Sequence, residues 1–162
     1  MQKLIQELKN RLKPAKAIAL LGVGSELRGD DAAGIMVAGQ LEKACRGNKR
    51  LKVFIGHTAP ENLTGEIKRF NPTHLVIVDC ADLGKKAGDA ALIDIDNMAG
   101  VSFCTHQLPV KVMADYLWQS IQCQIIIVGI QPKQLKFASK ASKEIMKSAR
   151  QLTKALKEIV NV

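Results

Sequence analysis

The sequence predicts an α/β protein, a three-layer α/β/α sandwich around a five-stranded, mostly parallel sheet with one antiparallel strand. Short apolar runs alternate along the chain with longer segments in which apolar residues recur at helical spacing. Strands that are covered on both faces have such unbroken apolar runs, because helices lie on both sides of a parallel sheet. We expect one domain over residues 1–162, since a chain of this length with 47% hydrophobic residues can bury a sizeable core.

The first part of the chain alternates between helical and strand patterns. A charged amphipathic segment comes first, and Pro14 ends it. A wholly apolar strand is predicted over Ala17–Gly22, followed by a helix from about Asp31 to the turn at Gly47. The run Leu51–Ile55 is the second predicted strand. This alternation is typical of a sheet built from parallel strands with helical crossovers.

The segment HTAPENL is predicted to open the next helix. Thr58 is placed to cap its N-terminus, Pro60 suits the first turn, and Glu61 would complete a capping box. The third predicted strand, His74–Ala81, stays apolar until it reaches Asp79. We therefore expect Asp79 at the carboxyl end of a buried strand.

The remaining elements include the one strand expected to run the other way. After the turn LGKKAGD, the fourth strand Ala90–Ile95 is close enough to form a hairpin, so we expect it to be antiparallel to the third strand. An irregular stretch containing His106 leads to a helix that begins at Pro109. The fifth strand is Gln124–Ile130, and a long basic helix follows.

The basic charge of the chain leaves nucleic-acid binding open as one hypothesis. The formal net charge is +9, but much of the excess lies in 133–157, where lysines alternate with apolar residues as on a solvated helix face. One Trp, one Tyr and four Phe supply few rings for base stacking. We therefore expect no nucleic-acid partner.

Membrane insertion and cysteine-based centres are disfavoured. No stretch approaches the ~20 apolar residues of a membrane span, and the charged start is not a signal peptide, so we expect an intracellular protein without a membrane partner. Cys45, Cys80, Cys104 and Cys123 form no C-x-x-C pair, which argues against a zinc knuckle, an iron–sulfur site and a redox dithiol. Buried, reduced thiols are the expectation.

Three polar residues fall near the carboxyl ends of the predicted strands, where open α/β sheets bind ligands. Asp31 follows the first strand across its glycine turn, Asp79 ends the third, and His106 lies in the loop before a helix. Two carboxylates that converge repel each other unless one is protonated or a cation lies between them. Two oxygens, one imidazole nitrogen and open positions would suit Zn²⁺ or Ni²⁺. The alternative is that the aspartates cap turns and that the histidine is structural.

Other polar residues near these turns have local explanations. The segment GVGSELRG matches neither a G-x-G-x-x-G motif nor a phosphate-binding loop, and no G-x-S-x-G motif occurs, so Ser25 is predicted to be a turn residue. Asp30 is either a hydrogen-bond acceptor behind the ligands or a helix N-cap. His57 and His74 are expected to be structural, since neither lies at a predicted strand end.

Five segments in this order, GVGSELRGDDAAG, GHTAPEN, HLVIVDCAD, THQLPV and VGIQP, resemble the [NiFe]-hydrogenase maturation endopeptidases, especially the type that serves formate-hydrogenlyase hydrogenase 3. The resemblance runs from about Ala17 to Pro132. It implies a phosphorylase/hydrolase-like fold and assigns the metal-binding and catalytic positions to Asp31, Asp79 and His106.

The resemblance also implies an activity and a partner. Such an enzyme removes a C-terminal extension from the hydrogenase large-subunit precursor after nickel insertion, and its three ligands recognise the nickel that the substrate already holds. Nickel would therefore come with the substrate, and zinc or cadmium could replace it in vitro. We expect a cytoplasmic monomer. A non-catalytic module that binds nickel or the hydrogenase subunit is the alternative.

Overall fold

The computed structural model describes residues 1–94, 102–104 and 107–161. Its elements in chain order are α1 (Gln2–Leu12), β1 (Ile18–Val23), the 3-10 helix η1 (Gly29–Ala32), α2 (Ala33–Ala44), β2 (Leu51–His57), the 3-10 helix η2 (Pro60–Leu63), α3 (Thr64–Phe70), β3 (His74–Asp82), β4 (Ala90–Ile93), β5 (Ser102–Phe103), α4 (Gln107–Ile121), β6 (Gln124–Ile130) and α5 (Lys143–Val160).

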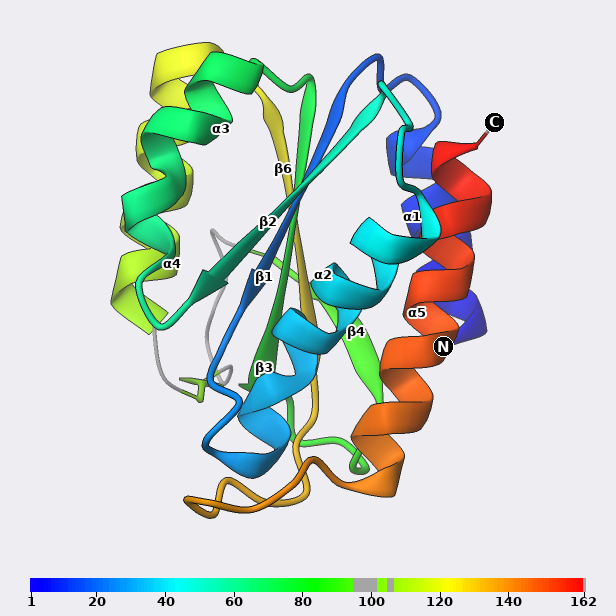
Figure 1. Ribbon diagram of the computed structural model, residues 1–162, viewed down its shortest axis with the longest axis vertical. Coiled ribbons are helices and arrows are strands. Elements are labelled where there is room, and N and C mark those ends of the chain that lie inside the picture. Colours follow the sequence, from blue (N-terminus) through cyan, green and yellow to red (C-terminus); the bar gives the residue numbers. More distant parts are fainter. Residues whose placement is uncertain (95–101, 105–106, 162) are drawn as a thin grey trace.

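The strands form one mixed sheet in the order β2-β1-β3-β6-β4, and the short β5 pairs with the end of β3. Strands β2, β1, β3 and β6 are mutually parallel, whereas β4 and β5 run antiparallel to their partners. Figure 1 shows α3 and α4 on one side of this sheet and α1, α2 and α5 on the other. The predicted three-layer α/β/α architecture is confirmed.

The predicted partner of the antiparallel strand is wrong. Strand β4 pairs with β6 and not with β3, because β1 and β6 already occupy both edges of β3 from His74 to Val78. The connection after β3 therefore crosses the end of β6. There the Gln131 side-chain oxygen accepts hydrogen bonds from the backbone N–H groups of Leu83 (2.7 Å) and Lys85 (3.2 Å). The sheet has one strand more than the five predicted, because the two-residue strand β5 was not predicted.

Two apolar cores lie on opposite faces of the sheet, and the alternation along β3 divides its side chains between them. Val76 and Val78 belong to the core under α1, α2 and α5, while Leu75 and Ile77 belong to the core under α3 and α4. All four are fully buried. The unbroken apolar run of this strand follows from burial on both faces.

The capping box predicted after β2 is wrong. No side chain caps the N-terminus of η2, which Ala59 precedes, although Pro60 does occupy its first turn as predicted. The backbone turns sharply here, with Ala59 N–H bonded to the Gly56 carbonyl at 3.1 Å, so Thr58 and Glu61 are not in capping geometry.

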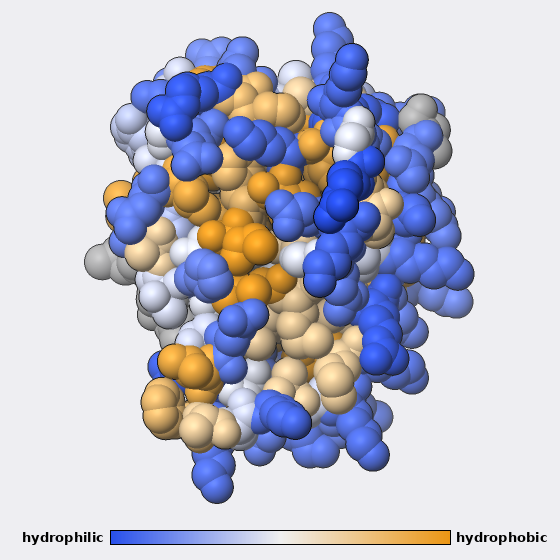
Figure 2. All heavy atoms as spheres, viewed as in Figure 1, coloured by the Kyte–Doolittle hydropathy of each residue, from blue (hydrophilic) through white to orange (hydrophobic). Residues whose placement is uncertain are grey.

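Hydrophilic side chains cover much of the face that Figure 2 shows. Figure 2 shows charged and polar side chains around the rim of one face, with apolar side chains gathered near its middle, over the edge strand β2. Leu51, Val53 and Ile55 of β2 are each only partly buried. None of the helices within the described residues is long and apolar enough to span a bilayer.

The start of α2 lies against the sheet at backbone contact distance. A Cβ atom added at Gly34 would lie 2.1 Å from the Val78 carbonyl oxygen and 2.4 Å from the Val23 carbonyl oxygen. On β1, a Cβ at Gly22 would lie 2.4 Å from the Gly34 carbonyl oxygen. Only glycine at both positions permits this approach, which fixes η1 over the carboxyl ends of β1 and β3.

We expect Gly34→Ala to lower the free energy of unfolding by at least about 1–3 kcal/mol, because its methyl group would overlap backbone atoms that cannot move aside. Gly39→Ala is the matched control in the same helix. A Cβ there meets no atom within 4 Å, so it should raise stability by about 0.5–1 kcal/mol through helix propensity. Urea unfolding measures both changes, and equal effects of the two substitutions would contradict the close approach.

Candidate functional site

The candidate site lies where β1 ends beside β3. Their last paired residues are Gly22 and Val78, which confirms that the two strands are neighbours. Beyond this pair β1 turns away toward η1, and β5 takes its place beside Ala81. Asp79 therefore lies at the point where one neighbour of β3 replaces another. Such switch points are common ligand sites in open α/β sheets.

The glycine turn after β1 positions Asp31. Gly24 has φ +133°, and a Cβ atom there would lie 1.8 Å from the Asp31 carbonyl oxygen, so the chain can fold back over η1 only with glycine. Ser25 N–H donates to the same carbonyl at 3.2 Å, and the Ser25 hydroxyl accepts from Leu27 N–H at 3.3 Å. Ser25 is a turn residue in the structure, as the sequence predicted.

Asp31 and Asp79 are both fully buried and interact electrostatically. One oxygen of Asp79 accepts a hydrogen bond from Cys80 N–H at 2.6 Å, and the other, Oδ2, is buried without a hydrogen-bond partner among the described residues. Burial raises the pKa of Asp79 to about 7. The Cys80 N–H opposes this shift, and the charge of Asp31 adds to it. A buried carboxylate oxygen without a donor fits a cation-binding position.

The third predicted ligand, His106, lies outside the described residues, and its role stays a prediction. The described segment that precedes it does reach the site, because Cys104 N–H donates to the Cys80 carbonyl at 3.1 Å. This bond continues the antiparallel register of β3 and β5, in which Ala81 pairs with Phe103.

Sequence reasoning missed a pair of thiols at this site. Ligand atoms of Asp31, Cys80 and Cys104 all lie within 4.8 Å of one another. A hydrogen bond with Cys104, together with burial, raises the pKa of the Cys80 thiol. The two cysteines are 24 positions apart, so a search for C-x-x-C motifs cannot find them. The available signal was their position, one residue after Asp79 and two residues before His106.

Asp30 has a different role from its neighbour Asp31. Its buried carboxylate accepts three backbone hydrogen bonds, from Lys133 N–H (2.7 Å), Gln134 N–H (3.0 Å) and Ser142 N–H (2.6 Å). Asp30 is not an N-cap, since Arg28 precedes η1, and its donors are loop backbone groups. Its predicted role behind the metal ligands stays a prediction. The three donors lie on the loop between β6 and α5. Asp30 therefore holds this loop against η1.

One prediction about the histidines in the described residues is wrong. His57 does lie at a strand end, because β2 extends to it and it pairs with Val23 at the end of β1. Its carbonyl accepts from Gly24 N–H at 2.9 Å, while its side chain is exposed. His74 begins β3 and contacts the Thr73 hydroxyl at 3.0 Å. Burial and the nearby Arg50 lower its pKa.

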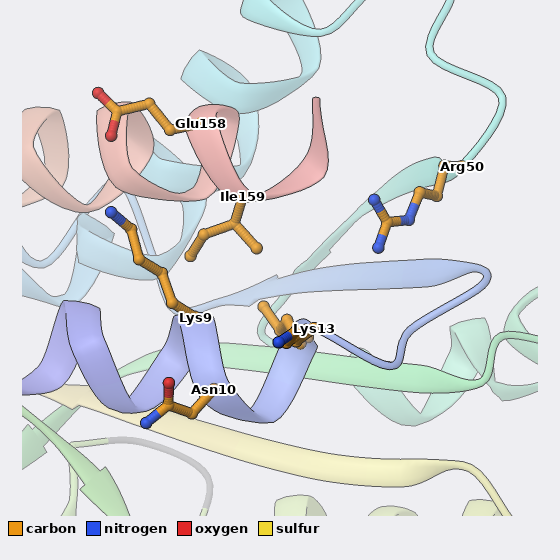
Figure 3. A pocket seen from close by; sticks show the side chains of 7 residues that line it. Lys9, Asn10, Lys13, Arg50, Glu158 and Ile159 are labelled. Carbon is orange, nitrogen blue, oxygen red and sulfur yellow. The ribbon is translucent and has the colours of Figure 1, made fainter. Parts of the chain in front are cut away.

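A surface pocket of about 400 Å³ lies elsewhere, between the end of α1, the residue before β2 and the end of α5. Figure 3 shows the side chains that line it, among them Lys9, Lys13, Arg50 and Glu158. Arg50 is already engaged, with two hydrogen bonds to the Ala15 carbonyl. This pocket lies at the amino ends of the strands and contains none of the predicted site residues.

The fold and the site define an α/β protein with a buried carboxylate pair and an adjacent thiol pair at the carboxyl edge of its sheet. The comparisons with known proteins agree with this class. A family model described as hydrogenase maturation protease matches residues 35–161. The hydrogenase 3 maturation protease of Escherichia coli K12 is 39% identical over 114 residues, 70% of this chain and 71% of that protein.

Two further relatives cover nearly the whole chain. A protein of Methanocaldococcus jannaschii, assigned by its name to the hydrogenase maturation proteases, is 38% identical over 94% of both chains. The crystal structure of the [NiFe] hydrogenase maturation protease HycI from Thermococcus kodakarensis superposes with a TM-score of 0.88, at 27% identity, over 96% of this chain and 99% of that one. The chain belongs to the HycI family of hydrogenase maturation proteases, and it is a hydrolase that acts on peptide bonds.

The raised pKa of Asp79 predicts a pH-dependent stability. Asp79 titrates at about 7 in the folded protein, against 3.8 for an ordinary aspartate, so between these values the folded state binds more protons than the unfolded state. The stability contributed by this group is complete below the lower pKa and is lost as pH rises through the upper one. Relative to Asp79→Asn, the wild type should lose up to about 1.4 kcal/mol per pH unit across this range. The free energy of unfolding of both proteins is measured in urea at several pH values. A difference between them that stays constant with pH would contradict the prediction.

Asp30 is predicted to be a structural anchor. Asp30→Asn turns one acceptor oxygen into an NH₂ group that faces a backbone donor, so we expect the free energy of unfolding to fall by about 1–3 kcal/mol. Asp115→Asn is the control. It removes only an exposed ion pair with Lys111 and should cost less than about 1 kcal/mol. Chemical denaturation compares the two, and an unchanged midpoint for Asp30→Asn would rule out the anchoring role.

Proposed function

We propose that this protease removes the C-terminal extension of a [NiFe]-hydrogenase large-subunit precursor after nickel insertion. In this proposal Asp31, Asp79 and His106 recognise the nickel that the precursor already holds. The observation that carries the proposal is the buried Oδ2 of Asp79, which has no hydrogen-bond partner in the described part of the chain and feels the charge of Asp31. Two carboxylates buried together are stabilised by a cation, and the substrate would supply it.

The relatives support this choice of substrate. The Escherichia coli relative is named for the maturation of hydrogenase 3, and the Thermococcus kodakarensis structure is that of a [NiFe] hydrogenase maturation protease. Both names associate the family with hydrogenase maturation, and the second names a nickel–iron hydrogenase. The first match covers 70% of this chain at 39% identity, and the second covers 96% of it in structure, so the same substrate class is the simplest proposal for this chain.

The ligand chemistry suits recognition of a nickel ion that stays bound to the hydrogenase precursor. Two carboxylates and an imidazole form a weaker set for soft divalent metals than the thiolates of a hydrogenase subunit. A weaker set can complete the coordination of nickel without removing it. An enzyme of this kind would distinguish nickel-loaded from empty precursor by the presence of the ion.

The protein groups at the site can also assist hydrolysis. Nickel held by the precursor supplies Lewis acidity toward the scissile carbonyl or a water. A carboxylate of the site would then accept a proton from the attacking water. Burial excludes bulk water from this step.

Apolar side chains beside the site are suited to contact a protein substrate. Leu27 and Phe137 are among the most exposed large hydrophobic residues of the described chain, at 62% and 70% exposure. They belong to the two loops that Asp30 fastens together, and Ala138 N–H donates to the Leu27 carbonyl at 2.8 Å. We assign these loops to contact with the precursor, whose cleaved segment must reach the carboxylates next to them.

The proposal predicts nickel-dependent processing. Purified protein is incubated with its cognate large-subunit precursor, with and without nickel, and intact mass reports the loss of a C-terminal fragment. We expect cleavage of the nickel-loaded form only. Asp31→Asn and His106→Ala should each lower the rate by about a hundredfold or more, because each removes a group that contacts the ion. Asp115→Asn should leave the rate unchanged.

Three outcomes would contradict the proposal. Cleavage without nickel would mean that the enzyme does not recognise the ion. Full activity of both ligand variants, with their folding verified by circular dichroism, would exclude the assigned residues. No cleavage of either precursor, despite binding, would favour a module that only docks on the subunit.

A further inference from the structure

The carboxyl edge of the sheet also brings together two thiols that the proposed activity does not use. Cys80 lies on β3, and Cys104 directly follows β5 in the position that the register Ala81–Phe103 places opposite it. The backbone bond from Cys104 N–H to the Cys80 carbonyl holds this pairing at 3.1 Å. Both cysteines are free thiols. Their proximity is therefore built into the sheet and does not depend on a chance contact of surface side chains.

The spacing of the donor atoms is close to that required by one metal ion. The two sulfurs and a carboxylate oxygen of Asp31 lie within 4.8 Å of one another. Zn–S bonds are about 2.3 Å and Zn–O bonds about 2.0–2.2 Å, and tetrahedral angles at the ion place the ligand atoms of one zinc about 3.5–3.8 Å apart. An inward movement of at most about 1 Å would therefore bring these three groups into coordination distance.

The surroundings favour a cation over an empty thiol pair. The groups whose charge acts on Cys80 are Cys104, Asp79 and Asp31, all of which become negative on ionisation. Asp79 precedes Cys80 on β3 and lies outside this cluster of ligand atoms, so it acts on the thiols through its charge and not as a ligand. Cys104 is only partly buried, which provides a route for an ion from solvent.

We propose that Cys80, Cys104 and Asp31 form a binding site for a thiophilic divalent cation of the zinc class in the protein without its substrate. Binding forms two metal–thiolate bonds and one metal–carboxylate bond, and it releases the two thiol protons to solvent. Two sulfurs and an oxygen distinguish this site from the proposed oxygen and nitrogen set for nickel, because sulfur ligands select softer metals. The protein alone suffices for this binding, so the inference can be tested without the precursor.

The test titrates Cd²⁺ into the full-length, reduced, metal-free protein and follows the ultraviolet charge-transfer absorption of cadmium–thiolate bonds. We expect the band to saturate at one ion per chain. Cys104→Ser, a substitution at a partly exposed position, should weaken binding by more than the tenfold to hundredfold typical of residues that only support ligands. Cys80→Ala should do the same, and Asp31→Asn should weaken binding while a thiolate band remains at saturation.

Matched controls are available in the same chain. Cys45→Ser and Cys123→Ser each remove a free thiol outside the cluster, and both should leave the band and the affinity unchanged. The site would be excluded by the absence of a charge-transfer band in the wild type. It would equally be excluded by an undiminished band in folded Cys104→Ser protein, or by loss of the band in Cys45→Ser or Cys123→Ser. Because no precursor is present, each result is independent of whether the protein cleaves a nickel-loaded subunit.

Discussion

The arrangement of the site depends on the contact between the backbone of α2 and the sheet. At Gly34 the helix touches the carbonyl oxygens of Val78 and Val23, so closely that no side chain fits between them. This contact brings η1, and with it Asp31, over the end of β3, where Asp79 follows Val78. A helix held at the usual side-chain separation would leave the two aspartates too far apart to interact. The glycines of this region thus determine how close Asp31 lies to Asp79, although they contribute no side chain to the site.

The two adjacent aspartates of the turn illustrate how one local sequence serves two purposes. The Asp30 carboxylate is satisfied by three backbone N–H groups of the loop before α5, which stabilise its charge without a metal. Asp31 instead lies with Asp79, whose own carboxylate has one N–H donor and a raised pKa. The first aspartate stabilises the loops around the site. The second contributes to an environment that costs stability, which is common where buried groups serve a function.

Much of the fold could be predicted because the apolar runs depend on local sequence. The strand Gln124–Ile130 was predicted with its observed limits, and the convergence of Asp31 with Asp79 followed from strand order alone. What could not be predicted depends on pairing between distant segments. The partner of β4 is set by which sheet edge is free, and the approach of Cys80 to Cys104 is set by a two-residue strand with little sequence signal. The role of Asp30 likewise depends on donors more than 100 positions away.

The thiol pair and the proposed nickel-recognising set share Asp31, and this sharing couples them. If the thiols and Asp31 hold a resident cation, the carboxylate has less negative charge to offer the nickel of a precursor. Linkage is reciprocal, so nickel bound through Asp31 must weaken the resident ion by the same factor. A site of this design would respond to two metals at once, the one carried by the substrate and the one available in solution. The coupling follows from the presence of one carboxylate in both ligand sets and requires no conformational change.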